Sequence, residues 1–187
     1  MRGDERIRLF VALELPEDAS EALHAFGVAL GAGRVVPARD LHVTLAFLGS
    51  VPAAVVGDVA RVVQRAVSAT PAPMLGVAGW RATRSVGMVV LHDDDGVASA
   101  LAAAVQAGLE AQGIYRPERR PWLPHVTVAR FRERPAIRVG PLPIRTFVPS
   151  GAAAYLSRPH PSGARYEALA RFGWDAEQPD EDQGVRG

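Results

Sequence analysis

A chain of 187 residues that is 48% hydrophobic has enough apolar material for the core of one domain or of two small lobes. It contains no cysteine, which excludes disulfides, thiolate metal sites and a cysteine nucleophile, and which fits a reducing cytoplasm. The net charge of +1 conceals an asymmetry, because an acidic segment follows Trp174 and leaves the preceding body of the chain basic, with Arg as its only strongly basic residue type.

The first half of the chain alternates between strand and helix patterns. Its first segment alternates apolar and less apolar residues, which predicts a half-buried strand with Phe10 on the less apolar face. The first helix begins at Pro16, where nearby acids suit the helix dipole, and ends before Gly31. The predicted elements are a strand over 7–14, a helix over 16–30, a strand over 42–48 that stops at Gly49, and a helix from near Pro52 to Val67.

The second half contains mostly strand patterns. The run Asp93-Asp94-Asp95-Gly96 is interpreted as a helix cap, because the downstream Glu of an EF-hand calcium loop is missing. Since strands and helices do not alternate strictly, the order predicts an α+β fold with an antiparallel sheet. The predicted elements are strands over 74–81 and 86–92, a helix over 97–109, and strands over 125–131, 144–149, 152–157 and 166–172.

The tripeptide His-Val-Thr occurs twice, at His42 and at His125, each time within an apolar run that predicts a strand. Only five His and five Thr are present in the chain, so the recurrence indicates an internal duplication. The spacing between the copies exceeds that of solenoid repeats, which predicts that each half forms a lobe.

Residues i and i+2 of a strand point to the same face, so each His lies beside its own Thr, Thr44 or Thr127. Two His can act as acid and base on a phosphodiester, because the imidazole pKa lies near neutrality, and the Thr hydroxyls can donate to phosphoryl oxygens. Two alternatives compete with this interpretation: solvated surface His, and a zinc site. The zinc site lacks further ligands, so we expect neither a metal nor a cofactor.

Arginines surround the second motif with little opposing acid. Such a cluster suits an anionic ligand, because the guanidinium fork matches phosphate geometry. Its members are Arg116, Arg119, Arg120, Arg130, Arg132, Arg134 and Arg138.

The two motifs, together with Arg8-Leu9-Phe10-Val11-Ala12-Leu13 and Arg165-Tyr166-Glu167-Ala168-Leu169-Ala170-Arg171-Phe172, make the chain resemble the 2H phosphoesterase superfamily. More narrowly, it is similar to the RNA 2′,3′-cyclic phosphodiesterases, historically called 2′-5′ RNA ligases. The resemblance implies two lobes of antiparallel sheet, related by a pseudo-two-fold axis, with outer helices and the active-site cleft between them. It also implies hydrolysis of RNA 2′,3′-cyclic phosphate ends to 2′-phosphomonoesters.

By the same resemblance, His42 is the acid toward the 3′ oxygen and His125 the base for water, although the symmetry of the motifs assigns neither role. Thr44, Thr127 and Arg130 would hold the phosphate. Phe10 matches a family position associated with base stacking, and ordinary packing of its ring is the alternative.

These features lead to expectations for the whole chain. Residues 1–174 form one bilobal domain and residues 175–187 a disordered acidic tail. No leader and no apolar run of about 18 residues is visible, so we expect a cytoplasmic protein that does not contact membranes. We also expect a monomer. The partner is RNA or an oligonucleotide with a cyclic phosphate end. The competing functions are an RNA-end binding module without turnover, and a relative that acts on 2′-5′ linked oligonucleotides or on a small cyclic nucleotide.

Overall fold

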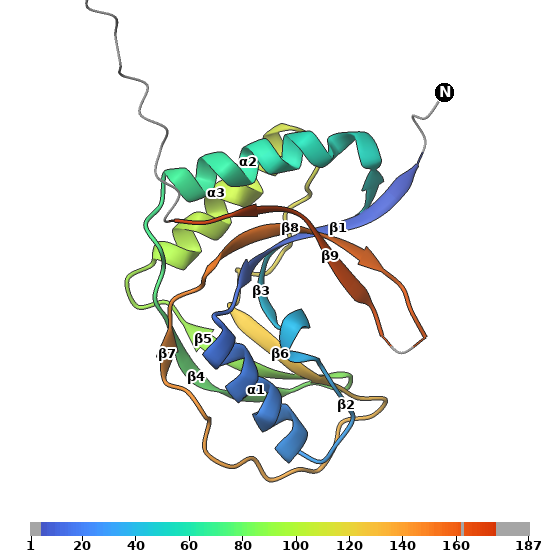
Figure 1. Ribbon diagram of the computed structural model, residues 1–187, viewed down its shortest axis with the longest axis vertical. Helices are drawn as coiled ribbons and strands as arrows, with labels where there is room; N and C mark the ends of the chain where they lie inside the picture. Colours follow the sequence, from blue (N-terminus) through green and yellow to red (C-terminus); the bar gives the residue numbers. More distant parts are fainter. Residues whose placement is uncertain (1–4, 162, 175–187) are drawn as a thin grey trace, which may run out of the picture.

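The computed structural model describes residues 5–161 and 163–174, so the acidic tail expected at 175–187 lies outside the described residues (Figure 1). The helices are α1 (Glu17–Ala29), α2 (Val56–Ser68) and α3 (Val97–Ala111), and short 3₁₀ turns occupy Ala38–Asp40 and Ala53–Val55. The strands are β1 (Arg6–Glu14), β2 (Arg34–Val35), β3 (His42–Pro52), β4 (Leu75–Ala82), β5 (Val86–His92), β6 (His125–Arg130), β7 (Thr146–Phe147), β8 (Gly151–Arg158) and β9 (Arg165–Phe172).

The strands form a single antiparallel sheet in the order β7-β4-β5-β6-β3-β1-β8-β9, with β2 added to β6. This arrangement confirms the predicted α+β class with an antiparallel sheet. The two halves of the sheet meet at β3 and β6, whose only residues in register within the described chain are Val43 and Val126. On one side of this narrow junction lie β1, β8 and β9, and on the other lie β4, β5 and β7.

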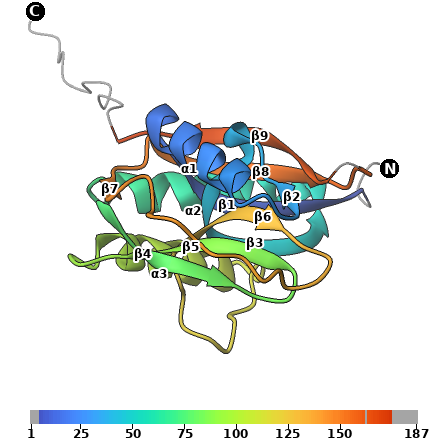
Figure 2. The same ribbon diagram turned by 90° about the horizontal axis from the view of Figure 1, so that it is seen from below.

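Helices α1 and α3 each pack against the half of the sheet opposite to the strand that they follow. Helix α1 follows β1 but packs against β6, and α3 follows β5 but packs against β3. Helix α2 packs against α3, β8 and β9. The two views place α2 and α1 toward opposite ends of the molecule, α2 at the top of Figure 1 and α1 toward the viewer in Figure 2. The order strand, helix, motif strand therefore occurs twice, as β1-α1-β3 and as β5-α3-β6, which matches the duplication seen in the sequence.

The alternation of apolar residues predicted a half-buried strand β1, but the structure shows a strand whose central residues are all buried. Residues Leu9 to Leu13 are all buried. Strand β3 pairs with one edge of β1 and β8 with the other, and the rings of Tyr155 and Tyr166 lie against Phe10. The side chain of Phe10 is only 4% exposed. Alternation along the sequence indicates one apolar face, but it does not reveal that side chains of the C-terminal strands cover Phe10 on the second face.

Three element boundaries also differ from the prediction. Strand β3 continues past Gly49 to Pro52, because Gly49 takes a φ of 68° within a register shift against β1 and so forms a bulge instead of an end. Helix α2 consequently begins at Val56, after a 3₁₀ turn. Strand β7 is limited to two residues between flanking prolines, which cannot donate to a ladder.

Candidate active site

The pairing of Val43 with Val126 places the two His-Val-Thr motifs side by side. Both Val side chains are fully buried, so their neighbours at positions i−1 and i+1 point to the other face of the sheet. In the antiparallel register His42 lies opposite Thr127, and Thr44 lies opposite His125. The two His are therefore diagonal neighbours, at a separation of about 7–8 Å for an ordinary sheet. This spacing leaves room for a phosphate group between them.

Both imidazoles are oriented in the same way by the backbone. Nδ1 of His42 donates a hydrogen bond of 2.7 Å to the carbonyl oxygen of Asp40, and Nδ1 of His125 donates one of 2.8 Å to that of Leu123. Each carbonyl belongs to the residue two positions before its His. Because a carbonyl oxygen only accepts, the proton of the neutral ring is fixed on Nδ1. Nε2 of each ring has no other partner within the described part of the chain, so it is available to a ligand.

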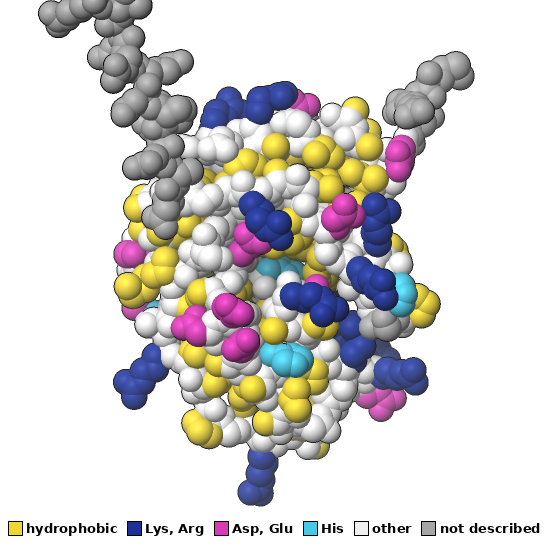
Figure 3. All heavy atoms as spheres, viewed as in Figure 1, with side chains coloured by type: hydrophobic (Ala, Val, Ile, Leu, Met, Phe, Trp, Pro, Cys, Tyr) yellow, Lys and Arg dark blue, Asp and Glu magenta, His cyan; other side chains and the backbone are white. Residues whose placement is uncertain are grey.

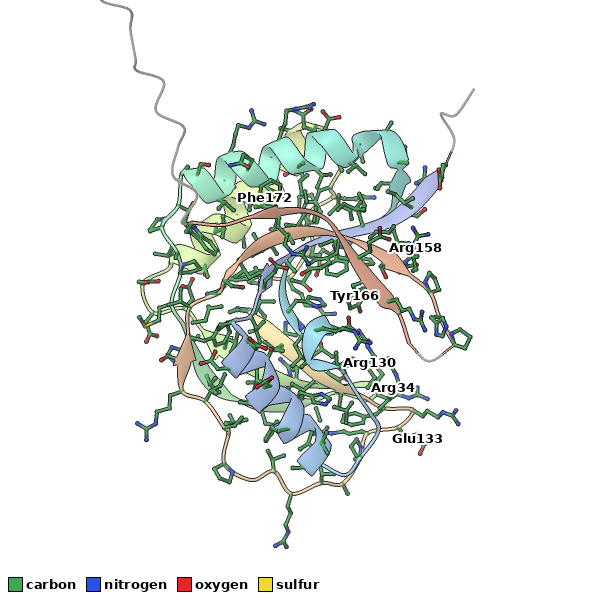
Figure 4. All side chains as sticks on the ribbon, viewed as in Figure 1. Arg34, Arg130, Glu133, Arg158, Tyr166 and Phe172 are labelled. Atoms are coloured by element: carbon green, nitrogen blue, oxygen red, sulfur yellow. The ribbon has the colours of Figure 1, made fainter. Side chains whose placement is uncertain are left out.

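A cavity of about 330 Å³ is lined by both motifs. His42, Thr44, His125 and Thr127 contribute to its wall, and Arg130 at the end of β6 adds a guanidinium group. Tyr166 of β9 also lines the cavity. Figure 4 shows Tyr166, Arg130 and Arg34 on the same side of the molecule, where β9 and β6 diverge. The space-filling view shows histidine in a hollow at the centre of this face, with arginine side chains around it (Figure 3).

Aromatic rings enclose His42. Its ring centroid lies 4.8 Å from that of Phe10, 5.4 Å from that of Tyr166 and 6.3 Å from that of Tyr155. Burial among these rings lowers the pKa of His42 to about 4, and the nearby charges of His125 and Arg130 act in the same direction, against the hydrogen bond to Asp40. His42 is therefore neutral at pH 7 in the free protein.

The sequence model of the 2′-5′ RNA ligase superfamily matches residues 13–142, which include both motifs and well over half of the chain. The chain belongs to the 2′-5′ RNA ligase superfamily. Membership of this group of 2H phosphoesterases supports an enzyme of the phosphoesterase or ligase type. A comparison with curated proteins gives no match.

Solved structures resemble the chain over nearly its whole length. The Thermus thermophilus protein TT0787 is 28% identical with a TM-score of 0.75, and the match covers 92% of this chain and 100% of that chain. A protein described as a phosphoesterase is 26% identical with a TM-score of 0.77, covering 90% of this chain and 98% of the other. Escherichia coli LigT in complex with NADP+ is 26% identical with a TM-score of 0.74, at the same coverage. The 2H phosphoesterase resemblance inferred from the motifs is thus confirmed.

Phe10, the residue expected to stack on a base, is covered by other side chains. With 4% of its surface exposed, its ring is covered by Tyr155, whose centroid lies 5.1 Å away in a stacked arrangement, and by Tyr166 edge-on at 5.0 Å. This burial favours ordinary packing of the Phe10 ring, and a contact between Phe10 and the substrate base stays an untested prediction. Phe10 supports one face of His42.

Tyr166 and Tyr155 were not predicted from the sequence to be site residues. Tyr166 is half-buried and lines the cavity. The hydroxyl of Tyr155 donates a hydrogen bond of 2.7 Å to the carboxylate of Glu14, which also accepts one of 2.9 Å from Nε of Arg171. Two Tyr in the final strands were a visible signal, but their approach to His42 depends on the pairing of β8 with β1, which the local sequence does not specify.

The structure separates the arginine cluster of the second motif into groups. Arg130 lines the cavity of the two His, whereas Arg120 lines a second cavity and Arg134 a third, beside Trp80. Arg119 and Arg132 are exposed and line none of these three cavities. The cluster therefore does not act as one uniform binding surface.

Two further features concern cofactors and membranes. Among residues 5–161 and 163–174, no group of three or more His, Asp or Glu side chains is arranged to hold a metal ion. None of the described helices is long and apolar enough to cross a membrane.

Proposed function

We propose that this protein hydrolyses the 2′,3′-cyclic phosphate at RNA ends to a 2′-phosphomonoester, by acid-base catalysis with His42 and His125 and without a metal ion or other cofactor. The observation that carries the proposal is the pair of imidazoles on one cavity, each held through Nδ1 by a backbone carbonyl with Nε2 left for a ligand. Two such groups are what proton transfer at an attacking water and at a leaving oxygen requires. Membership of the 2′-5′ RNA ligase superfamily supports it.

In the proposed reaction, the oxygen of water forms a bond to phosphorus while the bond from phosphorus to the ribose 3′ oxygen breaks. One His takes the proton of the water on Nε2, and the other gives a proton from Nε2 to the 3′ oxygen, which becomes a hydroxyl. The hydroxyls of Thr44 and Thr127 donate hydrogen bonds to the phosphoryl oxygens, where negative charge increases in the transition state. The guanidinium of Arg130 stabilises the same charge.

The state of His42 restricts the assignment of the two roles. The family resemblance makes His42 the acid, but its lowered pKa keeps it neutral in the free protein, and a neutral ring has no proton on Nε2 to give. A phosphate bound beside it favours the imidazolium form and raises its pKa. The assignment of His42 as acid therefore requires that substrate binding protonate it, whereas the reverse assignment does not.

Solved structures support a nucleotide as the substrate. Escherichia coli LigT, which is 26% identical in its complex with NADP+, is also described in complex with ATP. A protein of this fold thus binds nucleotides, which supports a nucleotide-bearing substrate here. We propose RNA processing in the cytoplasm as the setting, a monomer as the active species, and a single bilobal domain as its catalytic unit.

The experiment is incubation of the protein with a short oligonucleotide that ends in a 2′,3′-cyclic phosphate, followed by phosphorus NMR of the product. We expect a 2′-phosphomonoester, formed about 10²- to 10⁴-fold more slowly by His125→Ala. Recovery of mainly 3′-phosphate would contradict the proposed orientation of the ribose but not the two-histidine chemistry. Binding of the oligonucleotide without turnover would favour an end-binding module, and cleavage of a 2′-5′ linked oligonucleotide in preference to the cyclic end would favour that alternative substrate.

A further inference from the structure

A second, larger cavity adjoins the active site. Its volume is about 510 Å³, and it shares Thr44, Phe47, Met88 and His125 with the cavity that holds both motifs. One molecule that occupies both cavities would therefore contact His125 in each of them. The larger cavity extends away from His42 and Tyr166, which line only the smaller one, toward the loop that precedes the second motif. Its volume lies within the range of ordinary small-molecule sites.

Aromatic and apolar groups form one part of its wall. Trp122 is half-buried, and its indole Nε1 donates a hydrogen bond of 2.8 Å to the carbonyl oxygen of Thr44, which fixes the ring beside the first motif. Phe47 is 48% exposed and Leu123 is 40% exposed, so both present apolar surface that the protein itself leaves uncovered. Rings fixed at the wall of an open cavity suit the flat face of a nucleobase.

Cationic groups form the rim of the same cavity. The exposed side chains of Arg81 and Arg120 both line it, against the single carboxylate of Glu118. Arg81 comes from β4 and Arg120 from the loop before β6, so the two guanidinium groups belong to separate segments. Guanidinium groups beside aromatic rings are the combination with which proteins bind the backbone and the bases of single-stranded nucleic acids.

We propose that this second cavity binds the nucleoside that precedes the terminal one, so that the preferred substrate is an unpaired RNA strand of at least two nucleotides. This inference rests on the proposed function, because it assumes that the cyclic phosphate lies between His42 and His125. The terminal ribose is joined through its 5′ phosphate to the preceding nucleoside, and the two cavities meet at Thr44 and His125, where such a connection would cross. A base that enters the cavity must leave its helical stack, so a paired end is a poor substrate.

The test compares a dinucleotide that ends in a 2′,3′-cyclic phosphate with the corresponding mononucleotide 2′,3′-cyclic phosphate. We expect kcat/KM for the dinucleotide to exceed that for the mononucleotide by about tenfold or more, which is the order of one stacked base. Arg120→Ala and Arg81→Ala should each reduce this ratio by about threefold or more. Arg119→Ala is the matched control. It removes the same charge from the residue next to Arg120, and Arg119 does not line the cavity. We expect this variant to leave the ratio at the wild-type value.

A binding measurement separates this inference from the proposed function. Calorimetry with the unreactive 3′-phosphates of the same dinucleotide and mononucleotide gives the ratio of their Kd values, which we expect to favour the dinucleotide and to fall in Arg120→Ala whether or not turnover occurs. Absence of hydrolysis together with that binding preference would overturn the proposed function alone. Equal Kd and equal kcat/KM for the two lengths would overturn the inference, as would an equal loss of the ratio in Arg119→Ala, which indicates only a diffuse positive field.

Discussion

The ring of Phe10 lies 4.8 Å from the ring of His42, tilted by 33°, and it is the nearest of the aromatic rings around this imidazole. Phe10 belongs to β1, between β3 and β8, and its ring keeps water from one face of the His42 ring. The hydrogen bond from Nδ1 of His42 to Asp40 holds the ring edge in place. The backbone of Asp40 thus orients the ring of His42, and burial beside Phe10 helps to keep it neutral.

The protonation of His42 should depend on whether phosphate is bound. In the free protein its pKa is lowered to about 4 because burial disfavours the charged ring, so it binds a proton only when the pH falls well below the ordinary value of about 6.5. A phosphate ion favours the charged form, and the pKa should therefore rise. Proton NMR titration of the imidazoles, with and without inorganic phosphate, measures this shift. A ring of His42 that titrates near 6.5 in the free protein would contradict the effect of burial.

Each His should be required for turnover. His42→Ala and His125→Ala each remove one proton transfer, and we expect kcat on a cyclic-phosphate oligonucleotide to fall by about 10²- to 10⁴-fold. Circular dichroism should show an unchanged fold, since neither ring is fully buried. Thr70→Ala is a suitable control, because Thr70 lies after α2 and its hydroxyl donates to the helix carbonyl of Ala66, away from the catalytic cavity. Activity near the wild-type level in either His variant would exclude the two-histidine mechanism.

The sequence alone led to much of the fold, for identifiable reasons. Strands β5, β8 and β9 were predicted to within about one residue, because each is a largely apolar segment bounded by Gly, Pro or Asp. The motifs were visible because His-x-Thr places two functional groups on one strand face. The offset of the repeat also indicated that β3 and β6 are equivalent, although the register of Val43 against Val126 came only from the structure.

The surroundings of His42 could not be predicted in the same way. Phe10, Tyr155 and Tyr166 belong to β1, β8 and β9, which are far apart in the chain and meet through pairing of β1 with β8 and of β8 with β9. Local periodicity specifies which face of each strand is apolar, but it does not specify which strand lies beside it. The orientation of both imidazoles by the carbonyls of Asp40 and Leu123 is likewise a backbone property, for which the side chains at these positions give no signal.

Arg130 should be more sensitive to replacement than its neighbours in the arginine cluster. Arg130→Lys exchanges a planar fork for a point charge at the wall of the catalytic cavity, and we expect kcat/KM to fall by about tenfold or more. Arg132→Lys is the matched control, since Arg132 is exposed two positions further along and does not line that cavity. Steady-state kinetics on one oligonucleotide substrate compares the two variants. Equal losses would mean that Arg130 contributes only to the general positive charge of this region.

Catalysis should survive the removal of divalent ions. The proposed proton transfers use only imidazoles, and the phosphate charge is balanced by hydroxyls and a guanidinium group, so no step needs a metal. We expect the same kcat/KM before and after dialysis against EDTA. A rate that collapses on chelation and returns with one added divalent ion would show that a metal takes part in the reaction.

Phe10 and Tyr166 should have different kinetic roles, although their ring centroids lie only 5.0 Å apart. Phe10 is almost completely buried, so Phe10→Leu should leave KM near the wild-type value. The smaller side chain lets water reach the ring of His42, so the pKa of His42 should rise toward the ordinary imidazole value. We therefore expect a lower kcat and a pH profile that is shifted in the same direction. Tyr166 lines the cavity, so Tyr166→Ala should raise KM by about fivefold or more through the loss of a surface for the substrate base or ribose. Thermal unfolding of both variants serves as the control for stability. Because both side chains contact His42, the ratio of the effects on KM and kcat decides between packing and substrate contact. A rise in KM for Phe10→Leu with an unchanged pH profile would mean that the Phe10 ring reaches the substrate after all.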